Sequence, residues 1–147
     1  MPKSNYCLIA PTGKPLKVKI TVNNGIRLGS VFILWEIKNG KWNKKEKFQV
    51  ITGDTGVSEF TISKLPKDLE NNSLAWSINT CSLIPNVDRG EFTILVTQDG
   101  ENRWKKSSSR LVPKCEMGKQ LNFGSHLIFK HLINNNLSTS DLWKDTE

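Results

Sequence analysis

Apolar and polar residues alternate along most of the chain with a period of two, which is the pattern of half-buried β-strands rather than of helices. Between residues 16 and 22, for example, Leu16, Val18 and Ile20 alternate with lysine and threonine. The alternation recurs between turn signals rich in glycine, asparagine and proline, and it predicts further strands near residues 31–37, 42–51, 57–62, 74–81, 92–97, 103–106 and 121–129. About eight short strands and no long amphipathic helix indicate an all-β protein.

The one-sided strands favour a single-domain antiparallel β-sandwich, Ig-like or similar, over a barrel. Tight hairpins are predicted at Asn39–Gly40 and Asp99–Gly100, because both central residues of a type I′ turn need a positive φ. We expect the sandwich domain to cover residues 1–137 and the C-terminal tail, residues 138–147, to form one short helical turn. Residues 52–60 resemble the turn-to-strand segments of Ig-like sandwiches, a likeness too short to name a family.

The segment Val31–Ile37 is apolar at every position except Glu36. Such a strand is either covered on both faces or leaves one apolar face exposed to a partner. We assign Trp35 and Trp76 to the core, because each lies in the middle of an apolar strand.

The cysteine count argues against a disulfide framework or a zinc site built on cysteine, since there are three cysteines and no CxxC motif. Cys81 alternates with Ile78 and Trp76 in a strand-like pattern, so we expect it to be a buried free thiol. A bridge from Cys81 to Cys115 would require an oxidising compartment.

The net charge of +7 is concentrated in particular segments of the chain. Residues 38–47 contain five lysines and one glutamate, and residues 101–137 contain seven basic and two acidic residues. Such segments attract polyanions, anionic lipid heads or acidic protein faces. They are equally typical of lysines that protect the exposed edges of a sheet.

Two of the predicted hairpins combine tryptophan with basic residues and form the candidate binding site. The candidate residues are Lys41, Trp42, Lys44 and Lys45 in the first hairpin and Arg103, Trp104, Lys105 and Lys106 in the second. A tryptophan face stacks on bases or sugars while neighbouring lysines contact anions. The structural alternative, which we favour for each tryptophan, is packing at the edge of the core or in a cross-strand pair.

Catalytic and metal-binding patterns are not evident, and we predict no enzyme activity, no cofactor and no metal. His126 and His131 are five residues apart, which places them on opposite faces of a strand. The aspartates at positions 54, 88 and 99 lie in predicted turns, where the carboxylate satisfies local backbone N–H groups. Cys115 and His126 can be drawn as a nucleophile and a base, but nothing in their spacing supports the pair.

We therefore expect a non-enzymatic protein-interaction or assembly domain whose partner is another protein or a second copy of itself. A nucleic-acid-binding β domain is the second hypothesis, and a carbohydrate-binding module is the third. No apolar run approaches the roughly 18 residues of a membrane span. The apolar segment 6–10 is too short for a signal-peptide core. We expect a protein that is soluble, in the cytoplasm or exported without a cleaved signal peptide.

Overall fold

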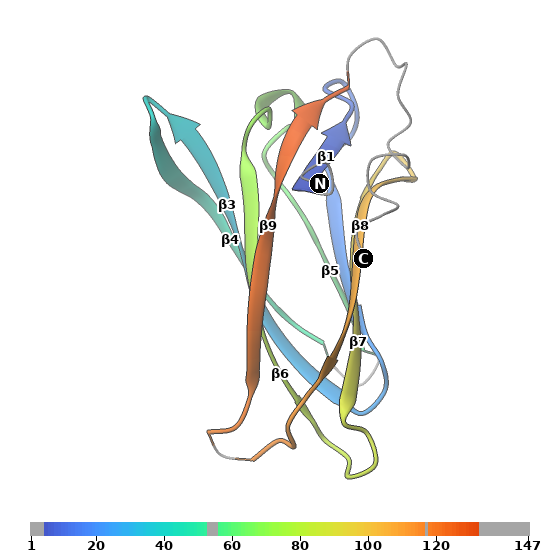
Figure 1. The fold of residues 1–147 in the computed structure, drawn as a ribbon. Coiled ribbons are helices and arrows are strands. Elements are labelled where there is room, and N and C mark those ends of the chain that lie inside the picture. The colour runs from blue at the N-terminus through green and yellow to red at the C-terminus, as the bar shows by residue number, and fades with distance from the viewer. Residues whose placement is uncertain (1–4, 53–55, 117, 133–147) are drawn as a thin grey trace.

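The chain folds as a β-sandwich of two packed sheets, which confirms the predicted fold class (Figure 1). The structure is a computed structural model that describes residues 5–52, 56–116 and 118–132; the predicted helical turn in residues 138–147 lies outside this part. The five-stranded sheet has the order β1 (Tyr6–Ile9), β9 (Leu121–His131), β6 (Ser73–Ser82), β3 (Ile26–Lys38) and β4 (Lys41–Ile51). The four-stranded sheet has the order β5 (Val57–Thr61), β2 (Lys17–Val22), β7 (Arg89–Gln98) and β8 (Glu101–Leu111).

One short 3-10 turn, η2 (Pro66–Asp68), connects the sheets between β5 and β6. Nothing helical in the described residues is long and apolar enough to cross a membrane.

Strand β1 is the element that the sequence pattern did not predict. It contains only four residues and pairs in parallel with the end of β9, where Tyr6 lies opposite Ile128 and Ile9 lies opposite His131. The other pairings of named strands are antiparallel. The addition of β1 brings the number of strands in the described residues to nine, against the eight or so expected.

Both predicted tight turns are present. Asn39 and Gly40 have φ values of 54° and 75°, and Asp99 and Gly100 have φ values of 54° and 79°. These left-handed pairs match the twist of the strands that they join. The first turn connects β3 to β4 and the second connects β7 to β8.

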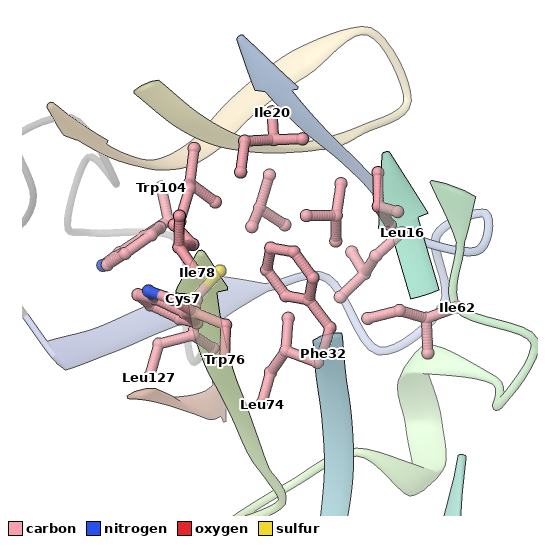
Figure 2. Packing of buried hydrophobic residues seen from close by; sticks show 14 of the residues in the cluster. Cys7, Leu16, Ile20, Phe32, Ile62, Leu74, Trp76, Ile78, Trp104 and Leu127 are labelled. Carbon is pink, nitrogen blue, oxygen red and sulfur yellow. The ribbon is translucent and has the colours of Figure 1, made fainter. Parts of the chain in front are cut away.

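The core lies between the sheets, and aromatic rings from both sheets meet along its middle. Phe48 stacks on Phe60 at 4.3 Å between ring centroids, and Phe60 contacts Phe32 at 5.0 Å. Trp76 then links Phe32 at 5.9 Å to Trp104 at 5.6 Å. Figure 2 shows Phe32, Trp76 and Trp104 among the aliphatic side chains of this core. Trp76 is 6% exposed, which confirms its predicted place in the core.

The expectation that Cys81 is a free thiol is wrong, because Cys81 forms a disulfide with Cys115. Cys115 belongs to the connection between β8 and β9, whose backbone also bonds to the end of β6: Ser82 N donates to Pro113 O, and Cys115 N donates to Ser82 O. Cys7 is the free cysteine of the described residues. It is fully buried, and this burial raises the pKa of the Cys7 thiol.

We predict that the disulfide stabilises the folded state by roughly 3–4 kcal/mol, because it closes a loop with a sequence separation of 34 residues. Urea unfolding with and without a phosphine reductant measures this difference. The double variant C81S/C115S is the control and should unfold at the same urea concentration in both conditions. Equal stability of the oxidised and reduced wild-type protein would show that the bridge contributes nothing.

Candidate functional site

The hairpin of β3 and β4 extends beyond the body of the sheet as a two-stranded arm (Figure 1). Strand β6 pairs with β3 only as far as Trp35, so the residues from Glu36 to Asn43 have no third strand beside them among the described residues. The first predicted hairpin therefore projects from the sandwich, and the polar residues 43–47 of its returning strand fit this exposed position.

Two glutamates attach the inner face of this arm to the chain that follows β5. Glu36 forms ion pairs with Lys45 at 3.2 Å and with Lys64 at 2.9 Å. Glu46 accepts hydrogen bonds from Ser63 Oγ at 2.5 Å and from Lys64 N at 3.1 Å. Hydrogen bonds from Lys64 and Lys45 hold the pKa of Glu36 below its usual value of 4.5.

A β-bulge in the arm explains why Lys45 reaches Glu36. Leu34 lies opposite Glu46, but the next residue, Trp35, lies opposite Lys44, so Lys45 is an extra residue in β4. The bulge turns this candidate binding residue toward a carboxylate of its own arm. Its charge is thus partly neutralised within the protein.

The outer face of the arm and of the sheet below it carries apolar side chains. Phe32 and Leu34 are fully buried on the inner face, so Val31, Ile33 and Trp35 lie on the opposite face, which no second sheet covers in the described structure. The assignment of Trp35 to the core is therefore wrong: its side chain is only partly buried and belongs to the outer face. Of the two interpretations of this apolar strand, the structure therefore supports the second: the outer face is apolar but no layer of the described structure covers it.

An open hollow of about 520 Å³ lies on this outer face, and Trp35 and Trp42 line it together with residues of the two neighbouring strands. The strand register places these residues together. Trp35 lies opposite Ser73 of β6, and Ala75 lies opposite His126 of β9. The remaining lining residue is Ser125.

The outer end of the hollow carries an exposed cross-strand pair of large apolar residues. Trp42 is 49% exposed and Ile37, directly opposite, is 45% exposed. Lys44, opposite Trp35, and Lys47, opposite Ile33, lie on the same outer face. Within the part of the chain that the structure describes, neither lysine forms an ion pair. Lys44 is a residue that the sequence predicted for the site, but Lys47 is not. Simple alternation places residues 44 and 47 on opposite faces of a strand, and only the bulge at Lys45 brings them to the same face.

The second predicted hairpin does not join this site, because β8 lies at the edge of the other sheet, away from β4. The structure buries Arg103 and Trp104, so the prediction that they form part of a binding site is wrong, whereas the packing alternative favoured for Trp104 is confirmed. A β-bulge makes Arg103 an extra residue between Asn102 and Trp104, and both side chains turn inward, with exposures of 7% and 1%. Lys105 remains exposed, whereas Lys106 is partly buried on the core-facing side of β8.

Arg103 contacts groups within the protein and is not available to bind a ligand. Its Nε donates to Gln98 Oε1 at 3.1 Å. The same glutamine amide binds both backbone groups of Ala10, each at 2.8 Å, so the arginine supports the turn after β1. These contacts leave the first hairpin as the candidate binding element.

The histidines have unrelated environments. His126 is exposed beside the hollow, whereas His131 Nε2 lies 2.8 Å from the backbone oxygen of Pro66. Cys115 is bound in the disulfide and offers no thiol to His126. Among the described residues, no group of three or more His, Cys, Asp and Glu side chains is arranged to hold a metal ion.

Fold and surface together define a β-sandwich that exposes an aromatic hollow on its five-stranded sheet. No protein-family model matches the chain, and no curated protein matches it. Among solved structures, the chain is similar to a domain of unknown function, DUF4425, from Bacteroides vulgatus, with a TM-score of 0.49 and 12% sequence identity. The similarity covers 84% of this chain and 100% of that chain.

We predict that replacing the two candidate tryptophans changes the free energy of unfolding by very different amounts. Trp104→Ala should destabilise the protein by about 3–5 kcal/mol, because it removes a fully buried ring from the core. Trp42→Ala should change stability by less than about 1 kcal/mol, because half of its side chain already contacts water. Urea unfolding of both variants measures the difference, and similar losses would contradict the two placements.

We also predict that acid loosens the arm. Because the folded-state pKa of Glu36 is depressed, its contribution is present above the unfolded value of 4.5 and is lost as the pH falls through the lower folded value. Side-chain NMR shifts of Lys45 and Lys64, whose ammonium groups contact Glu36, should follow this titration, and Glu36→Gln should remove it. Shifts that do not change with pH in the wild-type protein would contradict the ion pairs of Glu36 with Lys45 and Lys64, which together with the contacts of Glu46 form the brace of the arm.

Proposed function

We propose that this chain is a non-enzymatic interaction module that binds another protein through the outer face of the β3–β4 arm. The observation that carries the proposal is the apolar row Val31, Ile33, Trp35 and Ile37, with Trp42 beside its end. A sheet face that meets only water normally carries polar residues at these alternate positions. A contiguous apolar patch of this kind is typical of a surface that contacts a partner.

The dimensions of the row suit a protein interface. Residues 31 to 37 of an extended strand cover about 20 Å, at about 3.3 Å per residue. Exposed tryptophans are frequent anchors of protein interfaces, and a basic rim of Lys44 and Lys47 favours a partner whose apolar centre has acidic neighbours. The hollow beside Trp35 and Trp42 can accept a protruding apolar side chain.

The brace on the inner face of the arm supports this use. Contacts of Glu36 and Glu46 with residues 63–64 fix the arm before a partner arrives. Binding then requires less ordering of the hairpin, and less of the interaction energy is lost to conformational entropy.

Nucleic-acid binding is the second candidate function. Lys41 and Lys44 flank Trp42 in sequence, and neither forms an ion pair within the described residues. An indole that stacks on a base beside two such lysines is a common arrangement in single-strand binding. The engagement of Lys45 by Glu36 reduces the charge available to it.

The test is affinity capture from the lysate of the native cell with three forms of the tagged protein: wild type, Trp42→Ala and Leu111→Ala. Leu111 is 62% exposed on β8, at an edge away from the arm, and serves as a matched apolar control. We expect one or two proteins to be recovered stoichiometrically with the wild type and with Leu111→Ala. Recovery with Trp42→Ala should fall at least tenfold, because an anchor residue contributes about 2 kcal/mol or more.

Three other outcomes would reject the proposal. Equal recovery with Trp42→Ala would exclude the arm as the interface. Recovery that nuclease abolishes and that falls steeply with salt would favour nucleic acid, through the release of counterions. Capture of glycans without a consistent protein would favour a carbohydrate-binding module.

A further inference from the structure

A second feature lies along β8 and β9, where the edges of the two sheets face each other without a strand between them. Strand β1 pairs with β9 only from Ile128 to His131, so residues 121–127 of β9 have a sheet neighbour on one side only among the described residues. Strand β8 is the last strand of its own sheet. Figure 1 shows β8 and β9 continuing below the end of β1.

A slot of about 100 Å³ enters the core at this place. Its lining is apolar on the inside, where the rings of Trp76, Phe92 and Phe123 meet two isoleucines. Phe92 and Phe123 contact each other edge to face at 5.2 Å. A slot of this size has room for about one phenyl ring or a chain of about four carbon atoms.

Most of the polar lining comes from β8, whose core-facing side carries Lys106, Ser108 and Arg110, and Ser125 of β9 adds a hydroxyl. The register is unambiguous, because these residues lie opposite Ile94, Phe92 and Gly90 of β7, whose side chains or backbone face the core. The guanidinium of Arg110 lies 4.2 Å from the centre of the Phe123 ring. Two cations therefore border one apolar slot.

No carboxylate among the described residues lines the slot or forms an ion pair with Lys106 or Arg110. The acidic residue of the adjoining strand, Glu91, lies on the other face of its sheet and contacts Ser109. Positive charge next to an enclosed apolar surface attracts an anion that also has an apolar body, because both parts of such a molecule find a complementary environment.

We propose that this slot is a binding site for a small monocarboxylate with an apolar aryl or short acyl body. The body lies between Trp76, Phe92 and Phe123. The carboxylate lies at the mouth, where Lys106 and Arg110 provide the charge and Ser108 provides a hydroxyl donor. The slot contains no residue of the β3–β4 arm and shares only Ser125 with the lining of the hollow beside it, so the inference does not depend on the function proposed above.

The test is calorimetric titration of the full chain with phenylacetate and with pentanoate, and with phenylacetamide as the uncharged analogue. We expect saturable binding of one carboxylate per chain with a dissociation constant near the millimolar range, as suits about ten non-hydrogen atoms. The amide should bind at least tenfold more weakly, because it loses the charge-assisted hydrogen bonds.

The matched pair of variants is Lys106→Gln and Lys105→Gln. They remove the same charge from adjacent residues of β8, but Lys105 is exposed on the other face of the strand. Lys106→Gln should weaken carboxylate binding at least tenfold, whereas Lys105→Gln should leave it unchanged. Thermal unfolding of both variants checks that the fold is retained, and Ser108→Leu, which fills the mouth, should also block binding.

Absence of saturable binding of either carboxylate to the wild-type protein would overturn the proposal. So would equal affinity for phenylacetate and phenylacetamide, which would assign the slot to apolar contact alone. Equal losses with Lys105→Gln and Lys106→Gln would point to non-specific attraction by the net charge. Trp42→Ala should bind the carboxylate normally, which distinguishes this site from the arm.

Discussion

The edge-to-face contact between Trp76 and Trp104 is the interaction on which the rest of the structure depends. It joins β6 in the middle of one sheet to β8 at the edge of the other, and it continues the row of rings that begins at Phe48. Aromatic pairs of this kind add to the burial of apolar area. Because Trp104 packs in the core, the β7–β8 hairpin is held against the sandwich. The β3–β4 arm is then the predicted basic hairpin whose tryptophan, Trp42, is exposed.

Two β-bulges change the direction of basic side chains in the two hairpins. Each adds one residue to a hairpin strand, Lys45 in β4 and Arg103 in β8, and each of these residues turns to a polar group of the protein. A bulge reverses the alternation of the strand beyond it. One bulge therefore pairs Lys45 with a carboxylate of its own arm, although Lys45 stays exposed, and the other buries Arg103 beside Trp104. Trp42 stays on the surface.

The alternation of apolar residues was sufficient to predict the sandwich, and the Asn-Gly and Asp-Gly pairs were sufficient to predict both type I′ turns. It failed where a residue's surroundings depend on a distant segment. Trp35 has the sequence context of a core residue, and only the absence of a covering layer on that sheet face makes it a surface residue. Arg103 and Trp104 depend on a bulge that leaves no mark in the local sequence, and the partner of Cys81 depends on where the connection after β8 returns. The sequence shows the apolar row of β3, but only the three-dimensional structure shows whether its second face is covered by another layer or exposed.

The parallel pairing of β1 with β9 has a consequence for the order of events during synthesis. Of the strands in the described residues, β1 leaves the ribosome first, and its neighbour in the sheet, β9, leaves last. Until then the thiol of Cys7 has no shield, although it is inaccessible in the finished protein. When Cys81 emerges, Cys7 is already outside the ribosome, whereas the native partner of Cys81, Cys115, follows 34 residues later. In an oxidising environment the closing of the sheet by β9 therefore removes the competing thiol and makes the correct pairing permanent.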